Sequence, residues 1–176
     1  MPYRVVLTED DISRSLKRIA HEIIEAVPTA DSVLLLGIPT RGVHLANRLA
    51  QLLSSLTPGF QVSLGVLDVT MYRDDFVDAG RSIAQTQIPS SGLDSQTVIL
   101  VDDVLFSGRT IRAALDAIVD YGRPSQVKLA VLVDRGHREL PIRPDFIGKN
   151  LPTSSQERVS VRLAEVDGSD EVVIES

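Results

Sequence analysis

Short apolar runs alternate with amphipathic helical segments along most of this chain. The runs, which are apolar enough for buried parallel strands, lie at 33–37, 60–69, 97–101 and 126–133. The segments with helical periodicity lie at 8–27, 42–56 and 109–121. This alternation predicts an α/β fold, in which a mostly parallel central sheet is flanked by helices on both faces. Two later apolar runs, at 159–163 and 172–174, predict further strands around a turn at Asp167-Gly168.

Composition narrows the class of protein further. With 176 residues, of which 43% are hydrophobic, the chain can bury a core, and we expect a single domain over residues 1–176. It has no cysteine, which excludes disulfides and thiolate metal sites. No apolar run approaches the ~20 residues of a membrane helix, and the N-terminus lacks a signal-peptide core. We therefore expect a cytoplasmic protein without a membrane partner. A formal charge of −6 disfavours DNA as a partner, and any contact with nucleic acid must be local.

Polar segments follow three of the predicted strands, at 38–42, 102–110 and 134–138. Ligands of parallel α/β sheets bind at the carboxyl ends of the strands. The topology therefore predicts that these three segments meet in one site.

The most informative segment is 98–110, in which four apolar residues are followed by D-D-x-x-x-S-G-x-T. Adjacent carboxylates at Asp102 and Asp103 suit a pair of ribose hydroxyls or a nearby Mg²⁺. The turn with Ser107 and Gly108 opens a helix, whose free N–H groups suit a phosphate. The segment predicts a sugar-phosphate site. A plain capped turn is the alternative for S-G-x-T alone, and no Walker loop is present.

The pattern at 98–110 resembles the phosphoribosyl-pyrophosphate signature of type I phosphoribosyltransferases. The resemblance implies that family's fold, with a small base-binding hood, here built from the N-terminal and C-terminal segments. It implies that Asp102 and Asp103 contact the ribose, with Mg²⁺ as the cofactor. It further implies a 5′-phosphate site made by Val104, Leu105, Phe106, Ser107, Gly108, Arg109 and Thr110.

Two other segments resemble the pyrophosphate-binding parts of this family. Thr40 and Arg41 offer a hydroxyl and a bidentate guanidinium between Gly37 and Gly42. A tight turn with a solvated arginine is the alternative there. Segment 71–91 is polar and without periodicity, and it resembles the flexible catalytic loop that closes over the site. Its Arg81, which is deeper in the loop, and its Arg73 are candidate pyrophosphate ligands. The alternative is that both are solvated side chains of an exposed loop.

Two features of the sequence predict which base is the substrate: a departure from the pattern of purine phosphoribosyltransferases, and a resemblance to a narrower family. Purine phosphoribosyltransferases carry a further aspartate where this chain has Phe106, so a pyrimidine is favoured. Segments 67–75, 133–141 and 147–153 resemble the bacterial pyrimidine-operon attenuator/uracil phosphoribosyltransferase family. This resemblance implies conversion of uracil and phosphoribosyl pyrophosphate to UMP and pyrophosphate, with Asp134, Arg135 and Val159 at the base.

The same family binds mRNA leader hairpins when UMP is bound, and it forms homodimers and homotetramers. Basic side chains occur on one face of the first helix, including Lys17, and again between 135 and 149. A solvated helix face is the alternative for the first group. The RNA surface predicted from both groups consists of Arg14, Arg18, His21, His137, Arg138, Arg143 and Lys149.

Two other functions remain open at this level. One is a nucleotide-sensing RNA-binding regulator with weak catalysis, against which the intact Asp102, Asp103, Thr40 and Arg41 argue. The other is a salvage phosphoribosyltransferase for hypoxanthine or guanine, against which Phe106 argues.

Overall fold

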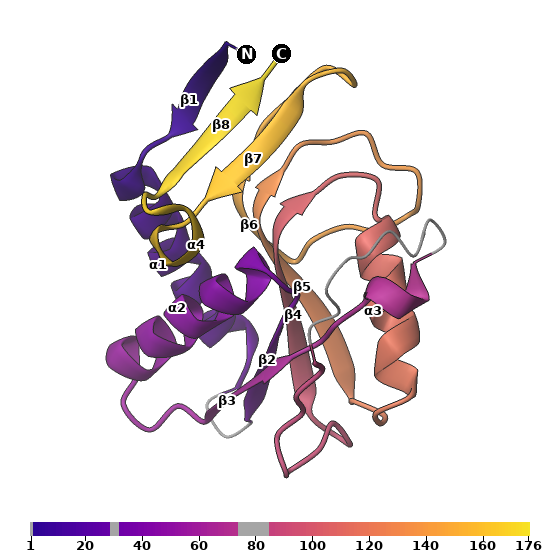
Figure 1. The fold of residues 1–176 in the computed structure, drawn as a ribbon. Helices are drawn as coiled ribbons and strands as arrows, with labels where there is room; N and C mark the ends of the chain where they lie inside the picture. Colours follow the sequence, from indigo (N-terminus) through magenta and orange to yellow (C-terminus); the bar gives the residue numbers. More distant parts are fainter. Residues whose placement is uncertain (1, 29–31, 74–84) are drawn as a thin grey trace.

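A five-stranded parallel sheet forms the centre of the molecule (Figure 1). The structure is a computed structural model that describes residues 2–28, 32–73 and 85–176. From one edge to the other, the strands are β3 (Val62–Val66), β2 (Val33–Gly37), β4 (Thr97–Leu105), β5 (Gln126–Asp134) and β6 (Phe146–Asn150). Because every neighbouring pair is parallel, the carboxyl ends of all five strands lie at one edge.

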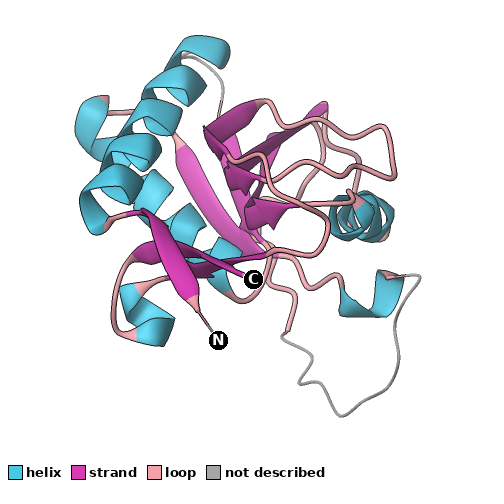
Figure 2. Ribbon diagram, turned by 90° about the horizontal axis from the view of Figure 1, so that it is seen from above, coloured by secondary structure: helices cyan, strands magenta, loops and turns pink. Residues whose placement is uncertain are grey.

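Helices cover both faces of this sheet, as expected for parallel strands. The helices α1 (Glu9–Ala26) and α2 (Arg41–Leu56) lie on one face, and α3 (Arg109–Val119) lies on the other (Figure 2). Helix α1 begins at a capping box, in which the Thr8 hydroxyl accepts from the Asp11 N–H and the Asp11 carboxylate accepts from the Thr8 N–H. Such a box satisfies two amide donors that the first turn leaves unpaired.

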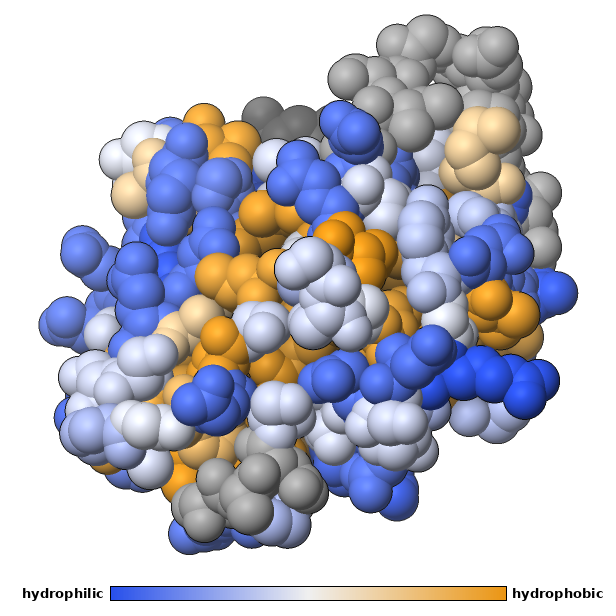
Figure 3. All heavy atoms as spheres, turned by 90° about the horizontal axis from the view of Figure 1, so that it is seen from below, coloured by the Kyte–Doolittle hydropathy of each residue, from blue (hydrophilic) through white to orange (hydrophobic). Residues whose placement is uncertain are grey.

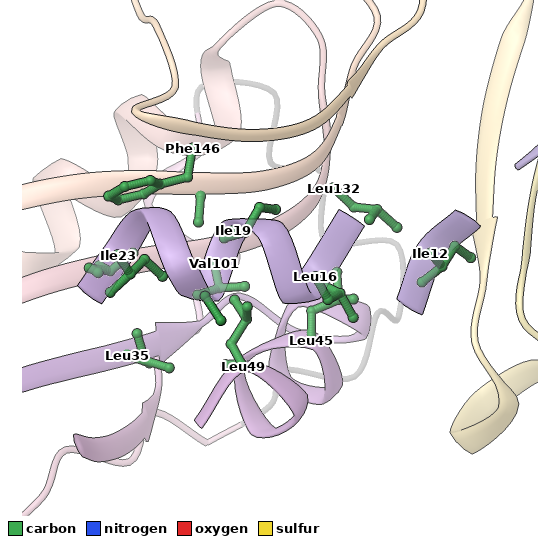
Figure 4. Close-up of a cluster of buried hydrophobic side chains, with 14 of the residues drawn as sticks. Ile12, Leu16, Ile19, Ile23, Leu35, Leu45, Leu49, Val101, Leu132 and Phe146 are labelled. Carbon is green, nitrogen blue, oxygen red and sulfur yellow. The ribbon is translucent and has the colours of Figure 1, made fainter. Parts of the chain in front are cut away.

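The larger core lies between α1, α2 and the sheet. Figure 4 shows α1 lodged between α2 and the strands β5 and β6. Burying one such aliphatic side chain contributes about 1.5–3 kcal/mol. The labelled side chains of this core are Ile12, Leu16, Ile19, Ile23, Leu35, Leu45, Leu49, Val101, Leu132 and Phe146. A second core, under α3, includes Leu34, Leu36, Leu100, Ile111 and Ala114.

A small antiparallel sheet above the carboxyl ends of the central strands forms the hood. Its strands are β1 (Tyr3–Leu7), β8 (Glu171–Glu175) and β7 (Arg158–Arg162), in that order. The pairing of β1 with β8 brings the two ends of the chain side by side at the top of Figure 1. One turn of helix, α4 (Ala164–Asp167), joins β7 to β8 where the sequence predicted only a turn.

The predicted fold class is confirmed, and one local prediction was wrong. Asp102 and Asp103 do not end their strand, because the pairing of β4 with β5 continues to Leu105, which lies opposite Asp134. Segment 136–150, for which the sequence predicted no strand, contains β6. In the described parts of segment 71–91, the 3₁₀ helix η1 (Thr70–Tyr72) lies at one end and Gln87 forms a β-bridge to Val66 near the other.

The end of the molecule opposite the hood is closed by loops. Viewed from below, apolar atoms occupy the middle of this end and hydrophilic side chains surround them (Figure 3). None of the helices in the described residues is both long and apolar enough to cross a membrane.

Candidate active site

A cavity of about 430 Å³ opens at the carboxyl ends of the central strands. It brings together residues that follow β2, β3 and β4, so two of the three predicted polar segments meet there. Its lining includes Thr40, Asp68, Arg73, Asp102, Asp103, Val104 and Thr110.

Close packing of α2 on β4 sets the position of the loop that carries Thr40. A Cβ atom at Gly42 would lie 2.4 Å from the carbonyl oxygen of Val101, so no larger residue fits there. The first turn of α2 therefore rests directly on the end of β4. The Pro39–Thr40 peptide bond is cis, and Thr40 lines the cavity next to Asp102.

The two acids of β4, Asp102 and Asp103, differ in environment. Asp102 is only 8% exposed, whereas Asp103 is partly exposed. Burial, and then the charge of Asp103, raise the pKa of the Asp102 carboxyl well above its ordinary value, and the charge of Arg73 opposes this. A cation or a hydroxyl donor in the cavity would favour the ionised form of Asp102.

The loop between β4 and α3 presents free backbone amides. Gly108 precedes the helix with φ 94°, a conformation that favours glycine. The amides of Ser107 and Gly108 have no acceptor among the described residues, and the Arg109 amide donates weakly to the Ser107 hydroxyl at 3.3 Å. Thr110 faces the cavity and accepts a hydrogen bond of 2.9 Å from Arg73. Amides at a helix start form a ready anion site.

A second cavity, of about 300 Å³, lies between Asp103 and the hood. Arg41 lines this cavity and not the first one, because its guanidinium is held by Asp167 of α4 at 2.7 Å and 3.1 Å. The Arg41 hydrogen bonds lower the pKa of the Asp167 carboxyl. The two residues predicted to bind pyrophosphate together, Thr40 and Arg41, thus line different cavities. The other lining residues of the second cavity are Asp103, Val104, Arg158, Val159, Ser160, Val161, Arg162 and Glu175.

Of the three residues predicted at the base, only Val159 lines the second cavity. Asp134 accepts from the Arg138 guanidinium at 2.6 Å and from the Gly136 amide at 3.0 Å. Arg135 is 7% exposed, donates to the Ser154 carbonyl, and stacks over the Phe106 ring at 4.1 Å. Its Nε is buried and has no acceptor within the described part of the chain.

Phe106 itself is 41% exposed, and its ring also meets the edge of His137. Of the two candidate loop arginines, Arg73 lies in the first cavity and Arg81 lies outside the described residues.

Most of the predicted RNA residues are exposed, and those on α1 lie next to β6. Arg14, Arg18 and His21 are exposed on α1, and Arg18 donates to the carbonyl oxygens of Ile147 and Gly148. Because α1 thus lies against β6, the two basic groups that were separate in the sequence adjoin each other. His137, Arg143 and Lys149 are likewise exposed.

Arg138 does not share this exposure. Its three guanidinium nitrogens donate inward, to the carbonyl oxygens of Ile142 and Phe106 and to the carboxylate of Asp134, and its side chain is 23% exposed. The sequence could not separate Arg138 from its exposed neighbours, because the direction of a loop side chain has no periodic signal.

The donor set of the first cavity suits Mg²⁺ that arrives with a phosphorylated ligand. Mg²⁺ prefers oxygen, keeps several waters, and is commonly bound by one or two carboxylates plus ligand phosphates. Asp102 and Asp103 line the cavity, and no cluster of three metal-binding side chains occurs in the described ranges.

Asp68 also lines the first cavity, and sequence reasoning missed it. Its Oδ2 is buried without a hydrogen-bond partner among the described residues, while its Oδ1 accepts from Thr70. The sequence did contain a signal for Asp68, because an acid that directly follows an apolar strand, as at 62–68, is expected at the carboxyl edge of the sheet.

The fold and this site together define a type I phosphoribosyltransferase. Residues 6–163 match the family model described as phosphoribosyl transferase domain. The hypoxanthine phosphoribosyltransferases of Trypanosoma cruzi and Staphylococcus aureus share the fold. The former has a TM-score of 0.73 at 17% identity over 98% of this chain and 91% of that one. The latter has a TM-score of 0.72 at 18% identity over 97% of this chain and 90% of that one.

The chain belongs to the family of proteins named bifunctional protein PyrR. The Streptomyces coelicolor member is 62% identical over 172 residues, which cover 97% of this chain and 89% of the relative. The Corynebacterium glutamicum member is 57% identical over 174 residues, which cover 96% and 90%.

Proposed function

We propose that this protein transfers a phosphoribosyl group from phosphoribosyl pyrophosphate to uracil, giving UMP and pyrophosphate. We propose further that it binds an mRNA leader hairpin when UMP is bound, and so regulates pyrimidine genes by transcription attenuation. The observation that supports the transfer most is the shared cavity of Thr40, Asp102, Asp103 and Thr110. The bifunctional PyrR relatives support the combination of two roles.

The substrate would lie along the carboxyl ends of β2 and β4. The 5′-phosphate accepts from the free amides of Ser107 and Gly108, and the ribose hydroxyls donate to Asp102 and Asp103. The pyrophosphate lies beside Thr40, and the anomeric carbon faces the second cavity.

In the reaction, the bond from the anomeric carbon to pyrophosphate breaks as a bond to N1 of uracil forms. Positive charge that develops on the sugar is stabilised by the two carboxylates, which are already held by the Asp103 and Val104 amides. The N1 proton leaves to solvent or to pyrophosphate. Mg²⁺ bound with the substrate would supply neutralisation of the pyrophosphate charge.

Arg41 would exchange its partner during the cycle. Its guanidinium is bound to Asp167 and is partly exposed, so the departing pyrophosphate can compete for it. Arg81, which lies outside the described residues, is proposed as a second pyrophosphate ligand. Arg73 is proposed to hold Thr110 in position through its hydrogen bond to the Thr110 hydroxyl.

Uracil would occupy the second cavity against the hood. Strand β7 is the edge of its sheet, and Val159, Ser160 and Val161 line this cavity. An edge strand offers backbone donors and acceptors, which match the carbonyl and N–H groups of a uracil ring. Arg135 would act through the Phe106 ring that it stacks on, and Asp134 through Arg138, rather than by lining the cavity.

For the regulatory role, the RNA surface would consist of exposed Arg14, Arg18 and His21 on α1 with His137, Arg143 and Lys149 beside them. We propose a cytoplasmic homodimer or homotetramer, as the family resemblance implies.

A turnover assay with uracil, phosphoribosyl pyrophosphate and Mg²⁺ tests the enzymatic proposal, with hypoxanthine and guanine in parallel. We expect UMP from uracil and no nucleotide from the purines. Turnover with guanine alone would favour purine salvage. RNA binding without turnover on any base would favour the sensing regulator.

A further inference from the structure

The segment that follows β5, Arg135–Ile142, holds the phosphate loop by its carbonyl oxygens. The Arg135 amide donates to Leu105 at 3.1 Å, and the Arg138 guanidinium donates to Phe106 at 2.7 Å. The Glu139 and Leu140 amides both donate to Ser107, at 2.9 Å and 3.2 Å. Three consecutive carbonyls of the loop are therefore bonded to this one segment.

This arrangement sets the direction of the loop amides. A peptide group directs its carbonyl and its N–H in opposite directions. Holding the carbonyls of Phe106 and Ser107 on the outer side leaves the amides of Ser107 and Gly108 directed away from the segment and without an acceptor in the described chain. Arg138 fixes one end of this arrangement, because its other nitrogens are held by Ile142 at 2.8 Å and Asp134 at 2.6 Å.

The same segment also carries His137 of the proposed RNA surface. His137 is exposed, touches the Phe106 ring by its edge, and has its Nε2 2.6 Å from the Thr153 carbonyl oxygen. Arg143 lies one residue beyond the segment and is exposed. One short stretch of chain thus contacts the loop, presents the exposed His137, and leads directly to the exposed Arg143.

We propose that Arg135–Ile142 links the nucleotide site to the RNA surface, with Arg138 as the positioning residue of the link. The inference rests on the proposed function and adds the route of its regulation. A 5′-phosphate on the loop amides strengthens the carbonyl bonds on the opposite side of the same peptides, which fixes the segment and its basic side chains. The effect is reciprocal, so RNA raises UMP affinity by the same factor.

The first test separates a positioning role from general loss of structure. Titration calorimetry of UMP and of uridine is performed on the wild-type protein, Arg138→Gln, Arg138→Lys and the control Arg123→Gln. Arg123 is exposed at the opposite end of β5. We expect Arg138→Gln to weaken UMP binding about tenfold and to leave uridine binding unchanged, because only the phosphate uses the loop. Arg138→Lys, which keeps one donor, should lose less. Equal weakening of both ligands, or none, would overturn the positioning role.

The second test measures the coupling itself. The dissociation constant of a leader hairpin from upstream of pyrimidine biosynthetic genes is measured at fixed salt, without UMP and with saturating UMP. Couplings of this kind typically change affinity about 5- to 150-fold. We expect Arg138→Gln to bring the ratio of the two constants close to one, whereas Arg143→Gln weakens both constants and keeps the ratio.

The two failures are distinguishable. A wild-type protein that binds no hairpin at any UMP concentration would refute the regulatory function and this link with it. Hairpin binding with an unchanged UMP ratio in Arg138→Gln and Arg138→Lys would refute only the link.

Discussion

Asp102 is a buried acid whose ionisation lowers the stability of the fold. It is nearly buried beside a second acid, and its pKa is raised, first by burial and then by Asp103. Between the unfolded and folded pKa values, the folded state holds more protons than the unfolded state. The free energy of unfolding therefore falls as the pH rises through that interval.

Replacing Asp102 should reverse this effect. We expect Asp102→Asn to unfold at a higher temperature than the wild type at neutral pH without ligand, by about 2–4 °C for each kcal/mol. The difference should disappear near pH 3, where Asp102 is protonated in both states, and turnover should be lost. Thermal unfolding across pH measures this, with exposed Asp116→Asn as the control. A wild-type advantage at neutral pH would contradict it.

The Arg41–Asp167 pair gives a second test at the residue scale. If pyrophosphate competes with Asp167 for Arg41, Asp167→Asn should bind pyrophosphate about two- to fivefold more tightly, as expected for losing an exposed pair of up to about 1 kcal/mol. Calorimetric titration of pyrophosphate measures this. Weaker binding in Asp167→Asn would show that Asp167 assists Arg41 instead.

The acid pair and the loop at 107–110 were predictable from the sequence, because a strand, two acids and a helix start form a contiguous pattern. The partners of Arg41 and Arg138 were not. Asp167 lies 126 positions from Arg41 and Phe106 lies 32 positions from Arg138, and single-sequence patterns carry no information about such pairs.

At the scale of elements, Arg48 is a second arginine of α2, besides Arg41, that connects this helix to the hood. Arg48 of α2 donates to Glu165 at 2.6 Å and 2.8 Å and to Asp170 at 2.6 Å and 2.9 Å. These bonds lower the pKa values of both carboxyls. Their stabilising contribution is therefore present above the unfolded pKa values and is lost as the pH falls.

Removal of Arg48 should loosen the hood. We expect Arg48→Ala to lower the free energy of unfolding at neutral pH by about 1–3 kcal/mol, since the network is partly buried and leaves two acids unpaired. The difference in the free energy of unfolding between the variant and the wild type should be smaller at acid pH. Urea denaturation at two pH values measures this, and Arg4→Ala, at an exposed hood position, is the control. Equal stability of the Arg48 variant would refute the role.

The contact between α2 and β4 is equally specific. A methyl group at Gly42 would meet the Val101 carbonyl oxygen at 2.4 Å, so Gly42→Ala should displace the Thr40 loop. We expect about 1–3 kcal/mol of destabilisation and a raised KM for phosphoribosyl pyrophosphate. Steady-state kinetics and denaturation measure the two effects, and an unchanged KM would contradict the proposed position of Thr40.

Elements with strong periodicity were predicted well, and the exceptions have physical causes. Strand β6 was not predicted from the sequence, because its five residues, FIGKN, form a short run that follows a segment rich in proline and basic residues. Its Gly148 lies so close to Leu132 that a Cβ would be 2.4 Å from the carbonyl oxygen, which only tertiary packing reveals. Strand β4 extends past Asp102 and Asp103 because its ladder with β5 continues there, against the polar character of its sequence.

At the scale of the whole molecule, a chain with charge −6 carries exposed basic side chains on α1 close to β6, where we propose that RNA binds. Contacts to RNA phosphates depend on salt. We expect Lys149→Gln to weaken hairpin binding severalfold at low salt, to reduce the salt dependence, and to leave uracil turnover intact. Binding assays at several salt concentrations measure this, and unchanged affinity would remove Lys149 from the surface.

The account depends most on where a nucleotide phosphate binds, and a crystal structure of the UMP complex measures this directly. We predict phosphate oxygens within hydrogen-bonding distance of the Ser107 and Gly108 amides, ribose hydroxyls on Asp102 and Asp103, and uracil against β7. A phosphate bound elsewhere, with the amides of 107–108 facing away from the nucleotide, would contradict it.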